Sequence, residues 1–211
     1  MNRPPEPTLV TDDAVVPGAR DVRASLDGPD DANACVVACP PHPQHGGSRS
    51  DGRLKVVADA LADGGIGCLR FDYGPWDDGR GESTDARAAL RWAVDRYDRI
   101  GLFGYSFGAA VALAVAADPP PAVGPLCATS VLAPPARVDA LDALAAVSEI
   151  GSPLQVLHGE RDQTVDWGPV VDAAREADAD VVTLSGDHFF VGGEARIGKA
   201  VADFLSTHCG G

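Results

Sequence analysis

The stretch that decides the fold is IGLFGYSFGAAVALAVAA, residues 100–117. Its first part, 100–105, is apolar throughout and predicts a strand buried on both faces, while the alanine-rich part 107–117 predicts a helix. The turn between them is Gly104-Tyr105-Ser106-Phe107-Gly108. On so sharp a strand-to-helix turn, Ser106 is expected at positive φ with room only for small residues two positions away on either side. Such a turn exposes Ser106 Oγ as a candidate nucleophile; the bland alternative is that the glycines only let the strand and helix pack closely.

Apolar runs and helical stretches alternate along the rest of the chain. Two short N-terminal strands are expected at 10–16 and 21–26. The later strands are expected at 34–39, 66–72, 100–105, 123–132, 154–158 and 181–184, and the helices at 51–62, 84–97, 107–117, 138–147, 168–177 and 193–206. Strict alternation of buried strands with helices implies right-handed crossovers in a mainly parallel sheet. We therefore expect one doubly wound α/β domain over residues 1–211.

The composition is acidic. The 211 residues carry a net charge of -14, and Lys55 and Lys199 are the only lysines. This charge argues against nucleic acid and anionic membranes as partners, which both attract basic surfaces. An aspartate-rich, lysine-poor surface resembles that of proteins from salt-loving archaea, in which concentrated salt screens self-repulsion. The bland alternative is an acidic protein from a GC-rich genome.

The N-terminus and the cysteines favour a cytoplasmic location. MNRPPEPTLVTDD lacks the apolar segment of a secretory signal, and no apolar run is long enough to span a membrane. Most of the five cysteines lie in or beside apolar runs, which is typical of core residues or free thiols, and we expect no disulfide to be needed. Cys35 and Cys39 lack a second ligand pair, and His42 and His45 fit plain loop residues better than a metal pair. No cofactor or metal is expected.

Two further residues follow strands, at the sheet edge where open parallel sheets place their ligand sites. Asp162 comes after strand 154–158 and can orient an imidazole through its Nδ1–H. Glu160 and Asp166 are rivals, and Asp162 could instead cap a turn. His188 follows the last strand, and histidine is the side chain that most often serves as a general base. The order along the chain is nucleophile, acid, base.

Backbone amides that could stabilise an oxyanion come from two places. The Phe107 amide lies at the start of the predicted helix 107–117. The loop CPPHPQHGG, residues 39–47, follows the strand 34–39. Because its prolines cannot donate, His42 and Gln44 are the amides that remain.

Together these segments resemble the α/β-hydrolase superfamily, and more narrowly its small dienelactone-hydrolase-like members. The resemblance runs from about residue 34 to the C-terminus. Its motifs are PHPQHGG at 41–47, LRFDY at 69–73, GYSFGA at 104–109, HGERDQTV at 158–165 and GDHFF at 186–190. It implies Ser106, His188 and Asp162 as nucleophile, base and acid, with the Phe107 and His42 amides as the oxyanion hole. His42 is preferred to Gln44 because it aligns with the residue after the His-Gly of many relatives.

The chain also departs from these relatives. Dienelactone hydrolase itself uses a cysteine nucleophile, so the resemblance implies nothing about lactones. The loop 74–83 is longer and more acidic than the relatives' pattern, and we expect it to overhang the site, with Trp76 or Tyr73 shaping the acyl pocket. Candidate substrate contacts are Gln44, Tyr73, Trp76 and Tyr105.

The expected activity is cleavage of a carboxylic ester, or a related acyl bond, through an acyl-enzyme. Only residues 133–153 are available for a lid, so we expect little or no lid domain and an open cleft. A thioesterase or acyltransferase would use the same residues, and a non-catalytic binding protein on the same fold is a further alternative. The partner is a small-molecule ester or thioester, and the sequence allows a homodimer.

Overall fold

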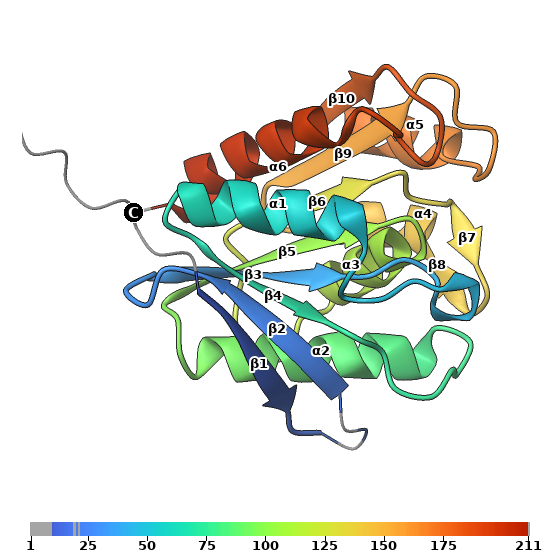
Figure 1. The fold of residues 1–211 in the computed structure, drawn as a ribbon. Helices are drawn as coiled ribbons and strands as arrows, with labels where there is room; N and C mark the ends of the chain where they lie inside the picture. Colours follow the sequence, from blue (N-terminus) through green and yellow to red (C-terminus); the bar gives the residue numbers. More distant parts are fainter. Residues whose placement is uncertain (1–9, 19, 21, 211) are drawn as a thin grey trace, which may run out of the picture.

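A computed structural model describes residues 10–18, 20 and 22–210. Its main sheet has eight strands in the order β1-β2-β4-β3-β5-β6-β9-β10 (Figure 1). The strands are β1 (Val10–Val16), β2 (Val22–Gly28), β3 (Ala34–Cys39), β4 (Gly67–Phe71), β5 (Arg99–Tyr105), β6 (Thr129–Leu132), β9 (Leu154–Gly159) and β10 (Asp180–Leu184). From β4 to β10 all neighbours pair in parallel, whereas β1 and β2 are antiparallel at one edge. The predicted mainly parallel sheet is confirmed.

Helices cover both faces of this sheet (Figure 1). On one face α1 (Gly52–Asp63) packs against α6 (Glu194–Cys209), over a cluster that includes Leu61 and Leu205. On the other face lie α2 (Arg80–Val94), α3 (Phe107–Ala117), α4 (Ala143–Val147) and α5 (Gly168–Glu176). The doubly buried strands follow from this arrangement, since β3, β4 and β9 are buried at every position.

Most predicted elements are found, and several differ from expectation in their bounds. The strand predicted at 21–26 is β2, with residue 21 outside the described residues. Strand β6 spans only Thr129–Leu132, not 123–132, because the chain turns at Gly124 with φ 68°. Helix α2 begins at Arg80 rather than 84, because the Glu82 carboxylate accepts from the amides of Asp77 (3.0 Å) and Gly79 (2.9 Å) and caps the earlier turn.

The helix predicted at 138–147 is largely wrong. A two-stranded hairpin, β7 (Arg137–Val138) and β8 (Leu141–Asp142), occupies its first half, and only α4 is helical. Asp139 makes the turn at φ 51°. The whole segment between β6 and β9 consists of this hairpin, α4 and short loops, so the expectation of little or no lid domain is confirmed.

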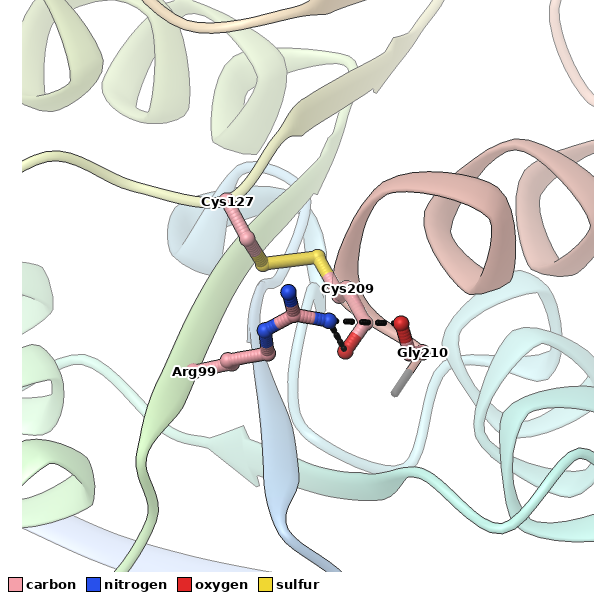
Figure 2. Close-up of a disulfide and its surroundings, with 4 residues drawn as sticks. All are labelled: Arg99, Cys127, Cys209 and Gly210. Atoms are coloured by element: carbon pink, nitrogen blue, oxygen red, sulfur yellow. Dashed lines mark hydrogen bonds between the residues drawn. A yellow bond between two sulfur atoms is a disulfide. The ribbon is translucent and has the colours of Figure 1, made fainter.

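The prediction that most of the cysteines are core residues or free thiols, with no disulfide needed, overlooked one pair. Cys127 and Cys209 form a disulfide that ties the end of α6 to the segment before β6 (Figure 2). Arg99 Nη1 donates to the Gly210 carbonyl oxygen beside it at 2.6 Å. Cys35, Cys39 and Cys68 are buried free thiols, as predicted. The disulfide removes the cysteine-based support for a cytoplasmic location.

No helix in the described part of the chain has the length and apolar character that crossing a membrane requires.

Candidate active site

Ser106 lies on a strained turn between β5 and α3. Its φ is 57° and its amide donates to the Leu132 carbonyl oxygen at 2.9 Å. A Cβ on Gly104 would come within 2.2 Å of the Gly108 carbonyl oxygen, and one on Gly108 within 2.2 Å of the Cys39 carbonyl oxygen. The positive φ and the need for glycine on both sides, predicted from the sequence, are therefore present in the structure.

The three predicted residues meet in one chain of hydrogen bonds. Ser106 Oγ lies 2.9 Å from His188 Nε2, and His188 Nδ1 lies 2.7 Å from Asp162 Oδ2. Asp162 and His188 are both buried. Neither rival carboxylate takes this place, since Glu160 pairs with Arg161 at 2.9 Å and Asp166, although it lines the same cavity, is exposed.

Asp162 decides how the imidazole is protonated. Its Oδ2 can only accept from His188 Nδ1, so Nδ1 carries the hydrogen and the Nε2 lone pair faces the Ser106 hydroxyl. The other oxygen, Oδ1, accepts from the amides of Thr164 (2.8 Å) and Val165 (3.4 Å). The carboxylate is thereby held in place, and Ser106 can pass a proton to Nε2.

The loop after β3 brings a second set of groups to Ser106. His42 precedes the single 3₁₀ turn Pro43–His45, and its carbonyl oxygen accepts from the amides of His45 and Gly47, each at 3.0 Å. The Gln44 amide, the other candidate oxyanion donor, already donates to His42 Nδ1 at 3.3 Å. The Phe107 amide, as the first residue of α3, has no acceptor within the helix.

These groups open into one cavity of about 730 Å³. Ser106, His188, Phe107, His42 and Tyr105 all line it. Besides lining the cavity, Tyr105 donates a hydrogen bond from its hydroxyl to the His188 carbonyl oxygen at 3.0 Å. Burial raises the pKa of Tyr105 to about 12, which keeps this donor protonated.

The other candidate substrate contacts are placed differently. Gln44 is exposed and is not among the lining residues. Trp76 and Tyr73 lie behind the lining, where the Trp76 ring stacks on His42 at 4.5 Å and both rings pack against Phe107. The Tyr73 hydroxyl donates to the Pro40 carbonyl oxygen at 3.3 Å, and burial raises the Tyr73 pKa well above its ordinary value. These two rings support the loop that carries His42.

Several lining residues were missed in the sequence. Arg53 stands 4.6 Å over the Tyr105 ring, pairs with Asp51, and donates from Nη1 to the Phe189 carbonyl oxygen at 3.3 Å. Further lining residues are Pro135, Val138, Thr164, Val165 and Phe189. Arg137, which pairs with Asp142, lines the cavity as well. Pro135, Thr164, Val165 and Phe189 lie in loops after strands, where position was the only signal because none of the four is titratable.

Known structures share this architecture. A serine hydrolase homologue from Coxiella burnetii is 27% identical, with a TM-score of 0.79 over 92% of this chain and 97% of its own. The chain has the α/β-hydrolase fold. A serine hydrolase without a lid from Xanthomonas campestris is 26% identical, with a TM-score of 0.77 over 97% of both chains. A dienelactone hydrolase from Anabaena variabilis is 19% identical, with a TM-score of 0.78 over 95% of this chain and 99% of its own.

No protein-family model matches the sequence, and a search of curated proteins finds no match. The similarity to serine hydrolases supports hydrolase activity.

Proposed function

We propose that this protein is a serine hydrolase that cleaves carboxylic esters through an acyl-enzyme. The observation that carries the proposal is the hydrogen-bonded chain from Asp162 through His188 to Ser106, with Ser106 open to the cavity. Ser106 Oγ attacks the acyl carbon while His188 Nε2 takes its proton. His188 then gives that proton to the leaving alkoxide, and water hydrolyses the acyl-enzyme by the same route.

In the tetrahedral intermediate the former carbonyl oxygen carries a negative charge, and this oxyanion needs hydrogen-bond donors directed at it. We assign this role to the amides of Phe107 and His42, which line the cavity beside Ser106. The α3 N-terminus adds a favourable field at the Phe107 amide. Loss of one such donor typically lowers kcat by about 10²- to 10³-fold.

The test is covalent labelling with a fluorophosphonate together with hydrolysis of p-nitrophenyl acetate. The wild type should be labelled once, at Ser106, and Ser106→Ala should lose labelling and lower kcat by about 10⁴-fold or more while staying folded. A folded Ser106→Ala variant with full esterase activity would contradict the proposal. A wild type that neither reacts nor hydrolyses any ester would indicate a binding protein instead.

A thioesterase or acyltransferase would use the same residues. Acyl transfer to water should exceed transfer to added alcohols or thiols if the protein is a hydrolase, and thioesters can be compared with oxygen esters in the same assay. The ratio of the two rates separates these activities without any change to the protein.

We also propose that the acidic surface is an adaptation to concentrated salt. The chain has a net charge of -14 and two lysines, so its negative side chains repel one another at low ionic strength. At about 3 M salt the Debye length falls below about 3 Å and this repulsion is screened. The unfolding temperature and the activity should therefore both rise from dilute to multimolar KCl, and indifference to salt would contradict the adaptation.

A further inference from the structure

Phe189 is an exposed aromatic side chain inside the cavity of Ser106. Among the described residues, the large apolar side chains that are exposed are Val15 (65%), Phe189 (52%) and Val191 (85%). Phe189 is the one of these that lines the cavity with Ser106 and His188. Its ring meets the His188 ring edge-on, with centroids 5.5 Å apart at 87°. An apolar surface therefore lies directly beside the imidazole.

The loop that carries this ring is held in place. Asp187 Oδ1 accepts from the amides of Phe189 (3.0 Å) and Phe190 (3.2 Å). Phe190 is buried in the cluster under α1 and α6, and Arg53 donates to the Phe189 carbonyl oxygen. The Phe189 ring is therefore exposed on an anchored backbone, so its position is available to a ligand without rearrangement of the loop.

The proposed chemistry fixes which part of an ester lies at this ring. The carbonyl oxygen must point toward the amides of Phe107 and His42. The leaving oxygen must lie within hydrogen-bond distance of His188 Nε2, because that atom returns the proton as the C–O bond breaks and the Ser106 Oγ–C bond is complete. The group attached to the leaving oxygen then passes over the residue next to His188, which is Phe189.

Two arginines line this cavity, Arg53 and Arg137, and each pairs with a carboxylate of the protein, Asp51 and Asp142 respectively, so neither is left for an anionic ligand. Arg53 donates from Nε to Asp51 Oδ1 at 2.9 Å, and a second guanidinium nitrogen pairs with the same carboxylate. Its remaining contacts are the Phe189 carbonyl oxygen and the face of Tyr105. Its charge is thus balanced within the protein, and Pro135, Val138 and Val165 add further apolar groups to the same cavity.

We propose that the natural substrate is an ester of an apolar alcohol, alkyl or aryl, and that Phe189 is the specificity-determining contact for that leaving group. The inference rests on the proposed esterase function. Each methylene that reaches the ring should raise kcat/KM by about two- to fourfold, since a fully buried methylene is worth about fourfold in equilibrium terms.

Two substrate series separate leaving-group from acyl recognition. The first varies the alcohol in acetate esters from ethyl to hexyl, over which the alcohol's acidity hardly changes. The second varies the acyl group in ethyl esters from acetate to octanoate. Because kcat/KM reports acylation, it includes the leaving-group contact even where deacylation limits turnover. For the wild type we expect kcat/KM to rise along the alcohol series.

Phe189→Ala should flatten the alcohol series, with the loss growing from about twofold at ethyl acetate to more than tenfold at hexyl acetate, and leave the slope of the acyl series unchanged. Phe189→Leu should restore most of the alcohol slope. Val191→Ala is the matched control, because Val191 is an exposed neighbour outside the cavity lining, and both series should match the wild type.

The inference is overturned if Phe189→Ala leaves the alcohol slope intact or lowers both series equally. Labelling of Ser106 by a fluorophosphonate keeps the two proposals apart. A labelled, active wild type with a flat alcohol series removes only the leaving-group inference, whereas a protein without labelling or esterase activity removes the proposed function itself.

Discussion

The His42 ring links the loop after β3 to the β7–β8 hairpin through Asp139. His42 Nε2 lies 3.6 Å from Asp139 Oδ2, and His42 Nδ1 accepts from the Gln44 amide at 3.3 Å. Burial, together with the neighbouring His45, lowers the pKa of His42 below its ordinary value. Because Nδ1 accepts a hydrogen bond, the ring hydrogen lies on Nε2 and faces Asp139. Nδ1 thus binds within the loop whose His42 amide we assign to the oxyanion hole, and Nε2 lies beside the Asp139 carboxylate.

Loss of the Asp139 carboxylate should weaken catalysis through the position of that amide. For Asp139→Gly we expect kcat to fall about tenfold with little change in KM, which is less than the 10²- to 10³-fold cost of losing a donor outright. Glycine suits the φ of 51° at this turn, so the variant adds no backbone strain. Steady-state kinetics on p-nitrophenyl acetate measure the effect.

Asp139→Asn is the matched control, since asparagine tolerates the same backbone conformation and keeps a side-chain oxygen beside Nε2. It should retain most of the wild-type kcat. Equal kcat values for Asp139→Gly and the wild type would show that His42 holds its place without this contact.

The Cys127–Cys209 disulfide should stabilise the fold without touching the chemistry. It closes a sequence separation of 82 residues, for which the loss of chain entropy in the unfolded state corresponds to about 4.5 kcal/mol. We expect the double variant Cys127→Ala/Cys209→Ala to lose roughly 2 to 4.5 kcal/mol of unfolding free energy, measured by urea denaturation. Because Cys127 precedes β6 and Ser106 follows β5, the disulfide and the nucleophile lie at opposite ends of parallel strands.

Reduction of the wild-type protein should reproduce this loss, and the double variant should not respond to reductant. Esterase activity well below the unfolding transition should be the same in all three samples. A double variant as stable as the oxidised wild type would mean that packing and the bonds from Arg99 hold α6 without the disulfide.

Asp85 should make stability depend on pH near neutrality. Burial raises its pKa from 3.8 to about 6, against the opposing effects of the Gly74 amide and Arg20. A folded-state pKa above the unfolded one favours the protonated form in the fold. The stability linked to this group is therefore fully present below about pH 4 and is lost as pH rises through about 6.

Asp85→Asn removes this titration and keeps an oxygen for the Gly74 amide, which Asp85 binds at 2.9 Å. Relative to the wild type, the variant should gain stability steadily between pH 4 and pH 7, as measured by urea denaturation along that range. Asp172→Asn, at an exposed helix position, is the matched control and should show no such trend. A difference between Asp85→Asn and the wild type that is constant with pH would contradict the shifted pKa.

The parts of the fold that were predictable depend on local signals. Strand β3 is buried on both faces, and helix α3 has the bounds that its alanine-rich sequence predicts. The β7–β8 hairpin was missed because residues 138–147 have helical spacing. Its turn instead depends on a non-local bond from the Ala140 amide to the Asp78 carbonyl oxygen, at 3.1 Å. The disulfide was missed for the same reason, since only the packed fold brings Cys209 to Cys127.

The residues of the candidate site also fall into two groups, those that local sequence signals predict and those that only the packed fold reveals. Ser106, Asp162 and His188 could be selected because each is a reactive residue type after a strand, where parallel sheets place their sites. Phe189 could not, because its significance lies in an exposed fraction of 52% inside the cavity. Trp76 and Tyr73 were recognisable as aromatic residues near the site, but only packing shows that they lie behind Phe107 and His42.

Gly108 should not tolerate a larger residue. A Cβ at this position would lie 2.2 Å from the Cys39 carbonyl oxygen and 2.4 Å from that of Pro40. Both atoms are backbone, so no side chain can rotate away, and either α3 or the loop leading to His42 must move. We expect Gly108→Ala to cost roughly 2 to 4 kcal/mol of unfolding free energy and to lower kcat in the fraction that folds.

Gly168→Ala separates this steric effect from the general effect of adding a methyl group to a helix. Gly168 opens α5, and a Cβ there would meet nothing within 4 Å, so this variant should be neutral or slightly more stable. Urea denaturation of both variants measures the contrast. If Gly108→Ala matched Gly168→Ala in stability and activity, the close approach of α3 to the end of β3 would not constrain the turn at Ser106, and the strain at this serine would need another source.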